Sequence, residues 1–271
     1  MQDIVKSYFE EKRIEYYSVI AYSDCHVTLS RLIEKENFTP KSVIVYLLPY
    51  YAGETVNISR YASSLDYHLA IKEIGEGLCS EINQHFPGAG CKSYGDHSPI
   101  DEIGAALASG LGIAGDNGLL INEKYGSYVF VGDVVTDISP EILGARTPMP
   151  VVRCEGCGAC KTVCPTGILR GEGSECLSAI TQKKGVLTPD EGLLMRKYNT
   201  AWGCDECQRI CPHNASPRIT PIEFFKRDNI FCLTREILDN MSDEDFSRRA
   251  FAWRKRATVE RNLDVLGEKD N

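Results

Sequence analysis

The sequence lacks any long apolar run and any apolar secretory core near its start. No stretch reaches the roughly 18 uncharged apolar residues that a membrane span needs, and residues 1–6 do not open a leader sequence. Low-complexity tracts are also missing, and a hydrophobic share of 43% excludes a disordered or collagen-like chain. We therefore expect a globular cytoplasmic protein with no membrane partner.

An excess of positive charge is missing too. The formal net charge is −8, which excludes a nucleic-acid binder that works through an overall positive field. The net charge does not exclude a local basic patch. The chain has 271 residues, enough to bury a substantial core in one large or two small domains.

Strand and helix patterns alternate over the first ~145 residues. Residues 16–21 predict a short strand, and the continuous apolar run 42–49 predicts a buried one. Apolar residues recur at helical spacing from Tyr67 to Ile82, which predicts an amphipathic helix.

Proline and glycine mark further elements. Pro99 opens a predicted helix with an acidic first turn that ends near Gly110. Residues 118–121 and 128–132 flank a turn and predict a hairpin. The tail, 221–271, is expected to be helical and to end in a polar stub.

Cysteine is the residue in excess, with twelve copies. Disulfides are rare in a reducing cytoplasm, and eight of the twelve fall between Cys154 and Cys211, where scattered core cysteines would not gather. The clustering therefore indicates that these cysteines bind metal. The isolated cysteines are interpreted as small buried hydrophobes, and they are Cys25, Cys79, Cys91 and Cys232.

A run with the spacing of a bacterial-type ferredoxin opens this segment, Cys154-x2-Cys157-x2-Cys160-x3-Cys164-Pro165. Glycines at 156 and 158 relax the backbone of a tight loop around a cubane cluster, and the proline turns the chain away. A second, split copy consists of Cys176 and then Cys204-x2-Cys207-x3-Cys211-Pro212. Eight thiolates are what two [4Fe–4S] clusters require.

In two-cluster ferredoxins the fourth cysteine of each run binds the other cluster. Under that rule one cluster is held by Cys154, Cys157, Cys160 and Cys211. The other is held by Cys164, Cys176, Cys204 and Cys207. The alternative is a pair of zinc sites, because zinc also takes four thiolates in Cys-x2-Cys pairs, although zinc ribbons rarely show a triple run followed by Cys-Pro.

Six stretches keep an order and spacing found together in one known family, across most of residues 40–215. They are Arg60-Tyr61-Ala62 with Asp66-Tyr67-His68, Asp96-x-Ser98-Pro99-x2-Glu102, Gly110-Leu111-Gly112-x2-Gly115-x-Asn117, 126–133 with Thr136-Asp137, Cys176-Leu177-Ser178-x-Ile180-Thr181, and Cys207-Gln208-x2-Cys211-Pro212-x-Asn214. Together they resemble the epoxyqueuosine reductase family, in a short form without the C-terminal helical-repeat domain that many members carry.

The resemblance implies a cobalamin enzyme that is fed by two [4Fe–4S] clusters. The family reduces the epoxide of epoxyqueuosine in the tRNA anticodon to the alkene of queuosine. Asp96 stands at the family's general-acid position, where an acid that faces a corrinoid in an apolar pocket has a raised pKa. From its position alone, Asp96 is instead a cap for the helix that begins near Pro99.

The same resemblance supplies candidates for contacts with the corrinoid or its neighbours. They are Ser59, Tyr67, His68, Ser98, Gly112, Gly115, Asn117 and Thr181. The two glycines would let the backbone approach a flat macrocycle, although such glycines also end helices and form turns. His68 would contact the corrin ring, or it would be a core histidine whose ring nitrogens are hydrogen-bonded within the protein.

Six basic residues gather between 248 and 261, with Phe251 and Trp253 among them. Such a basic tail can meet the phosphates of a tRNA anticodon loop and stack a base. The alternative is an amphipathic terminal helix with a solvated basic face and its aromatic residues in the core. We also expect a monomer that takes electrons from a donor such as ferredoxin or flavodoxin.

The predicted fold class is α+β, in three parts. An α/β domain that binds cobalamin and substrate covers 1–146, a double [4Fe–4S] ferredoxin-like domain covers 147–218, and a helical segment covers 219–271. Two other functions compete with an epoxyqueuosine-type oxidoreductase. One is a related corrinoid reductase with another small substrate, favoured by Asp116 where the family usually has lysine. The other is a ferredoxin-like electron-transfer protein.

Overall fold

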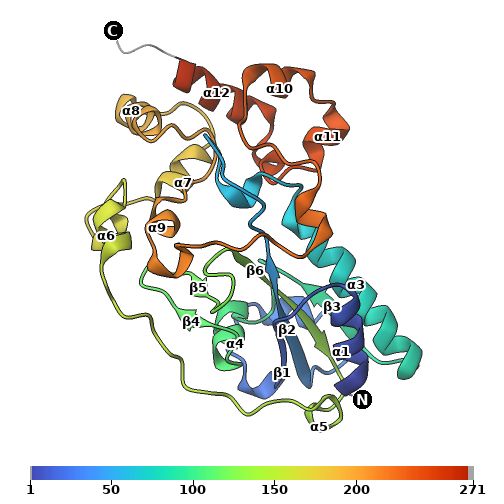
Figure 1. The fold of residues 1–271 in the computed structure, drawn as a ribbon. Helices are drawn as coiled ribbons and strands as arrows, with labels where there is room; N and C mark the ends of the chain where they lie inside the picture. Colours follow the sequence, from blue (N-terminus) through green and yellow to red (C-terminus); the bar gives the residue numbers. More distant parts are fainter. Residues whose placement is uncertain (1, 268–271) are drawn as a thin grey trace. The chain divides into compact units, whose positions relative to one another are not determined.

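The computed structural model describes residues 2–267, which form two compact units (Figure 1). Within the described residues, unit 1 comprises 2–49 and His68–Glu155. Unit 2 comprises Tyr50–Tyr67 and 156–267. The chain therefore leaves unit 1 after its second strand, contributes one segment to unit 2, and returns.

Unit 1 is built on a four-stranded antiparallel sheet with the strand order β1-β2-β6-β3. Its elements, in chain order, are α1 (Gln2–Glu11), β1 (Tyr17–Ala21), η1 (Tyr22–Asp24), α2 (Ser30–Ile33), β2 (Ser42–Pro49), α3 (Tyr67–His85), β3 (Cys91–Tyr94), α4 (Glu102–Ala108), β4 (Ile113–Ala114), β5 (Leu120–Ile121), β6 (Val129–Thr136) and α5 (Pro140–Leu143).

Helices cover both faces of this sheet, and Figure 1 shows α1 and α4 on opposite sides of it. Val45 and Leu47 of β2 pack in one cluster with residues of α4, whereas Tyr46 contacts Phe9 of α1, with 5.2 Å between the ring centroids. Successive side chains of a strand point to opposite faces. Both faces of β2 are therefore buried, which explains its uninterrupted apolar run from Val43 to Pro49.

Unit 2 contains short helices joined by loops. Its elements are η2 (Arg60–Ala62), α6 (Ala159–Val163), η3 (Ile168–Arg170), α7 (Leu177–Thr181), α8 (Pro189–Lys197), α9 (Glu206–Arg209), η4 (Pro212–Asn214), η5 (Glu223–Lys226), α10 (Arg235–Asn240), α11 (Asp243–Ser247), η6 (Ala252–Arg254) and α12 (Arg256–Gly267). The core centres on Trp202, which is fully buried beside Phe251. The indole nitrogen of Trp202 donates to the Tyr61 hydroxyl at 2.9 Å.

Several predicted elements are confirmed. The strand over 42–49 is observed at both predicted ends, and the strand over 16–21 is observed from residue 17. The helix predicted from Tyr67 begins there and buries the four periodic apolar residues that follow it. The tail is helical as far as residue 267, and its predicted polar stub lies outside the described residues.

One predicted element, the hairpin, is wrong, and one predicted helix is confirmed with a later start. Residues 120–121 pair with 113–114 and not with 128–132, because β6 forms eight residue pairs with β2, and this long-range pairing prevails over the local hairpin turn. The helix predicted from Pro99 begins at Glu102. Residues before it remain extended, since the Pro99 carbonyl accepts backbone hydrogen bonds from Thr28 and Leu29.

The compact units differ from the predicted domain bounds at 146 and 218. Residues 50–67 belong with the cysteine segment, since Ser59 N donates to Trp202 O at 2.7 Å and Ala201 N donates to Asn57 O at 2.6 Å. These pairings join chain segments about 140 residues apart, and composition carries no signal for them. None of the helices in the described part of the chain combines the length and apolar character that a membrane crossing needs.

Candidate functional site

Short helices of unit 2 lie within the two cysteine runs. Helix α6 lies within the first run and α9 within the second, and the two helices pack against each other. Gly156 and Gly158 have φ values of 66° and 76°, a left-handed conformation that glycine adopts without strain. The loop between the first cysteines is therefore shaped as predicted for a tight wrap around a cluster.

Backbone N–H groups point at cysteine sulfurs of these runs. In unit 1, Asp116 N donates to Cys154 Sγ at 3.3 Å. In unit 2, burial raises the pKa of Cys164, but N–H groups that include those of Leu169 and Thr166 outweigh it, and the net pKa is lowered. Hydrogen bonds of this kind favour the thiolate, which is the form that binds iron.

The donor set fits a pair of iron–sulfur clusters in number and chemistry. Cys154 lies in unit 1 and the other seven cysteines of the segment lie in unit 2. Over residues 2–267, no three His, Cys, Asp or Glu side chains converge on a point that one metal ion would occupy. A cubane cluster does not need such convergence, because each of its four thiolates binds a different iron atom.

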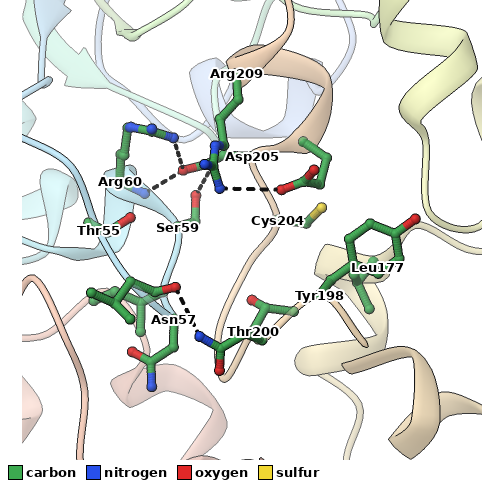
Figure 2. A pocket seen from close by; sticks show the side chains of 14 residues that line it. Thr55, Asn57, Ser59, Arg60, Leu177, Tyr198, Thr200, Cys204, Asp205 and Arg209 are labelled. Atoms are coloured by element: carbon green, nitrogen blue, oxygen red, sulfur yellow. Dashed lines mark hydrogen bonds and ion pairs between the residues drawn. The ribbon is translucent and has the colours of Figure 1, made fainter. Parts of the chain in front are cut away.

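A buried polar network in unit 2 surrounds Asp205, the residue after Cys204. Its carboxylate accepts from the Ser59 hydroxyl, from Arg60 N at 2.7 Å, and from the Arg60 guanidinium at 3.2 Å (Figure 2). Burial raises the pKa of Asp205, although Ser59 and Arg60 oppose the rise. The pocket beside it has a volume of only ≈30 Å³, space for water and not for a macrocycle. The network therefore fixes the loop that carries Cys204.

Asp96 lies in unit 1, just beyond the end of β3, in a left-handed backbone conformation with a φ of 61°. Its N–H donates to both carboxylate oxygens of Glu102, at 3.0 and 3.1 Å. The His68 Nε2 atom is 3.6 Å from an Asp96 carboxylate oxygen, and the Asp96 side chain is 66% exposed. The structure thus brings two predicted site residues, Asp96 and His68, together on an accessible surface.

The interpretation of Asp96 as a helix cap is wrong. Asp101 is the residue before α4, and its side chain accepts from Gly104 N at 2.9 Å. The cap is Asp101 because the helix begins at Glu102, three residues after the predicted start at Pro99. Asp96 is left with no role in ending or starting a helix.

Two further acids of unit 1, Glu102 and Asp133, have raised pKa values. The sequence analysis predicts neither as a site residue. Burial raises the pKa of Glu102 to about 8, with Asp133 and Asp96 adding to the rise. Burial also raises the pKa of Asp133 to about 7, against a lowering by the Ser98 hydroxyl. Within residues 2–267, neither Asp133 carboxylate oxygen has a well-formed hydrogen bond. A lone acid in the apolar stretch 128–136 is the sequence signal that could have identified Asp133.

Besides His68, four predicted corrinoid contacts lie in unit 1. A Cβ atom on Gly112 would stand 2.6 Å from the Ile121 carbonyl oxygen, and one on Gly115 would stand 2.5 Å from the Asn117 side chain. The chain itself therefore requires both glycines. Ser98 is buried and accepts from Ile100 N. The Asn117 amide nitrogen is buried and has no partner in the part of the chain that the structure describes, so it fits an acceptor on a ligand.

Three further candidates lie in unit 2. Ser59 donates to Asp205, as described above. Thr181 is fully buried, donates to Ser178 O at 2.7 Å and accepts from Gly203 N at 2.9 Å. Tyr67 is half-buried at the start of α3. The hydroxyls of Ser59 and Thr181 are thus engaged within unit 2 itself.

Much of the basic tail is used inside unit 2. Arg249, Arg256 and Arg261 each donate to backbone carbonyl oxygens, and the shortest of these bonds are 2.5, 2.6 and 2.6 Å long. Phe251 is buried in the core. Trp253 instead is 58% exposed, with the Arg254 guanidinium 3.9 Å from its ring centroid. The two alternatives for the tail therefore divide between different residues of the same segment.

Two known families match parts of the chain. The family described as "4Fe-4S double cluster binding domain" matches residues 153–214. The family described as "Epoxyqueuosine reductase QueG, DUF1730" matches residues 33–97. The first covers the predicted cluster segment, and the second ends one residue beyond Asp96.

Curated relatives carry the name epoxyqueuosine reductase. The protein of Leadbetterella byssophila is 33% identical over 240 residues, which cover 84% of this chain and 78% of the relative. The protein of Listeria monocytogenes is 31% identical over 218 residues, covering 77% of this chain and 56% of the relative. The aligned part of the chain thus spans 56% and 78% of these two relatives, and 44% of the Escherichia coli protein, which is 34% identical over 177 residues.

Solved structures show the same fold. The epoxyqueuosine reductase of Bacillus subtilis matches with a TM-score of 0.77 at 21% identity, over 98% of this chain and 80% of that one. The enzyme of Streptococcus thermophilus matches with a TM-score of 0.73 at 22% identity, over 97% and 80%. The match to the double-cluster family supports the two [4Fe–4S] clusters predicted from the sequence. The identity shared with relatives of which it spans more than three quarters shows that this chain is an oxidoreductase of the epoxyqueuosine reductase family.

Proposed function

We propose that this chain reduces epoxyqueuosine in tRNA to queuosine, using two [4Fe–4S] clusters and cobalamin. The observation that carries the proposal is 33% identity to a curated epoxyqueuosine reductase, over 78% of that relative's length. One solved epoxyqueuosine reductase with the same fold was determined with a stem loop of tRNA-Tyr that carries epoxyqueuosine. Substrate, cofactors and site residues below follow from this proposal.

Removal of an epoxide oxygen as water consumes two electrons and two protons. The eight cysteines between 154 and 211 would hold the clusters, which supply electrons one at a time. Bound cobalamin would supply a strongly reducing centre for the carbon that loses oxygen. Of the candidates in unit 1, the amide of Asn117 is the group best placed to hold it, because its buried N–H donors await an acceptor.

Asp96 is the proposed general acid for the departing oxygen. Glu102 holds the Asp96 backbone through two hydrogen bonds, and this fixes the loop at a left-handed residue. Glu102 and Asp133 keep protons near neutral pH, since their pKa values are about 8 and about 7. They therefore form a store from which Asp96 can be reprotonated. In the Bacillus subtilis protein, a catalytic loop with an aspartate is described as swung out of the active site, and the exposed Asp96 loop is proposed to move likewise.

The proposed tRNA contact in unit 2 is narrower than the whole basic tail. It consists of Trp253 with Arg254 and the exposed Arg248 and Lys255. An exposed indole beside cationic groups suits base stacking next to phosphates. A cytoplasmic monomer that takes electrons from a ferredoxin or flavodoxin completes the proposal.

Turnover on tRNA tests the proposal. Holoenzyme with measured iron and cobalamin is incubated anaerobically with a strong reductant and epoxyqueuosine-containing tRNA, and released nucleosides are identified by mass spectrometry. The wild type should form queuosine, and Asp96→Asn should be slower by roughly 10²-fold or more, as for loss of an acid. Asp24→Asn, at an exposed residue in unit 1, is the matched control.

The outcomes test the substrate assignment and the acid role of Asp96 separately. A fully loaded wild type that leaves epoxyqueuosine unchanged would contradict the proposed substrate. Equal rates for wild type and Asp96→Asn would remove Asp96 from the acid role and leave the substrate assignment intact.

A further inference from the structure

Two cysteines outside the cluster segment bring their sulfur atoms together in unit 1. The Cys91 thiol donates to the sulfur of Cys79, with 2.7 Å between the two Sγ atoms, and both residues are thiols in the structure. A disulfide bond is about 2.05 Å long, so a small movement of two side chains closes it. Twelve positions separate these residues in the sequence, and only the fold makes them a pair.

The surrounding structure holds the pair in place. Cys79 lies on α3, and Cys91 is the first residue of β3, opposite Thr136 of β6. The preceding turn is pinned at Gly90, whose carbonyl accepts from the Thr136 hydroxyl at 2.8 Å and whose N–H donates to Asp137 at 3.0 Å. Both thiols are half-buried. The sulfurs are thus preorganised and still partly accessible.

We propose that Cys79 and Cys91 are a reversible oxidation site, which forms a disulfide by exchange with a low-molecular-weight disulfide such as oxidised glutathione. The Cys79 thiolate attacks one glutathione sulfur, forms a mixed disulfide and releases one glutathione. Cys91 then gives its proton to solvent, attacks the Cys79 sulfur and releases the second glutathione. Two protein thiols are oxidised, and one glutathione disulfide is reduced to two thiols.

The environment assigns these two roles. The hydrogen bond with Cys79 and burial both raise the pKa of Cys91, so Cys91 is the poorer first nucleophile. It becomes the resolving thiol, because after the first exchange its target sulfur is already beside it.

The crosslink would join the two elements that carry the Asp96 site. Helix α3 begins at Tyr67, next to His68, and β3 ends at Tyr94, two residues before Asp96. Oxidation would therefore tie the element that bears the histidine to the strand that leads to the acid. The oxidation site itself does not rest on the proposed function, and its test needs no turnover.

The test is a redox titration of the anaerobically purified holoprotein. Samples are equilibrated at defined ratios of reduced to oxidised glutathione, remaining thiols are alkylated, and peptides are identified by mass spectrometry. We expect a linked peptide that contains Cys79 and Cys91, two hydrogens lighter than the reduced pair, and its loss on addition of dithiothreitol. The linked fraction should rise as the ratio becomes more oxidising.

Variants and controls make the assignment specific. Cys79→Ser and Cys91→Ser should each abolish the linked peptide, whereas Cys232→Ser, at an isolated cysteine of unit 2, should leave it unchanged. Cys91→Ser should also retain a glutathione mixed disulfide on Cys79. Full alkylation of both thiols at every ratio, or a mixed disulfide in the wild type that never resolves, would overturn the proposal. The wild-type measurement decides the matter even if a variant fails to fold.

Discussion

Asp133 gives the sharpest physical prediction of the structure, because burial outweighs the one group, the Ser98 hydroxyl, that lowers its pKa. It lies in the middle of β6, is fully buried, and its pKa is raised from 3.8 to about 7, chiefly by burial. Asp133→Asn keeps the shape of the side chain and removes the charge. The substitution should therefore stabilise the protein at high pH and have a much smaller effect at low pH.

The magnitude follows from the pKa. One pKa unit corresponds to about 1.4 kcal/mol, so ionised Asp133 costs the native state about 4 kcal/mol relative to the unfolded chain. Because the native pKa is raised, the contribution of this group to stability is complete below pH 3.8 and is lost as the pH rises through 7. Between pH 5 and pH 8 the wild type should lose about 3 kcal/mol that Asp133→Asn keeps.

The assay is anaerobic urea denaturation of both proteins at pH 5, 6.5 and 8, followed by far-ultraviolet circular dichroism. The readout is the difference in unfolding free energy between Asp133→Asn and wild type, which should grow with pH. Asp24→Asn makes the same chemical change at an exposed residue and should show no such growth. A difference that is constant would refute the reasoning, since it would mean that the native pKa of Asp133 is not raised. A difference that falls as the pH rises would also refute it, since native Asp133 would then be a stabilised carboxylate.

Three further predictions concern the clusters, the packing and the tRNA surface. Cys157→Ser should lower bound iron from about eight to about four atoms per chain by loss of one cluster, measured by elemental analysis, whereas Cys232→Ser should keep the full amount. Gly112→Ala should lower the free energy of unfolding by about 1–3 kcal/mol, because its Cβ would stand 2.6 Å from the Ile121 carbonyl oxygen. Gly192→Ala in α8, where the nearest atom is 3.6 Å away, should raise it by up to about 1 kcal/mol. Equal melting temperatures for the two variants would contradict this prediction. Trp253→Ala should weaken tRNA binding in a filter or anisotropy assay by roughly 1–3 kcal/mol if the indole stacks a base, Trp253→Phe should weaken it less, and Lys184→Ala, at an exposed lysine of the same unit, serves as control.

Local patterns predicted the elements that rest on local physics. The buried strand over 42–49 and the amphipathic helix from Tyr67 both depend on the periodicity of their own side chains, and both are confirmed. The φ values at Gly156 and Gly158 agree with the loop expected from the cysteine spacing. In each case the sequence window that carries the signal is as long as the element itself.

Long-range pairing explains what the sequence did not reveal. The hairpin expected around residue 124 gives way to β6 pairing with β2, whose paired residues lie 80 or more positions earlier. The proximity of Cys79 to Cys91, and of Ser59 to Asp205, likewise depends on tertiary contacts. Family motifs indicated Asp96 as the general acid, whereas Glu102 and Asp133 became candidates only through their burial and raised pKa values.

The proposed electron path requires two iron–sulfur clusters, and one measurement addresses it directly. Iron, acid-labile sulfide, zinc and cobalt are quantified together in a single anaerobic preparation of the wild-type protein. Two [4Fe–4S] clusters predict about eight iron and eight sulfide per chain. Zinc bound at about two atoms per chain, with neither iron nor sulfide, would contradict the account.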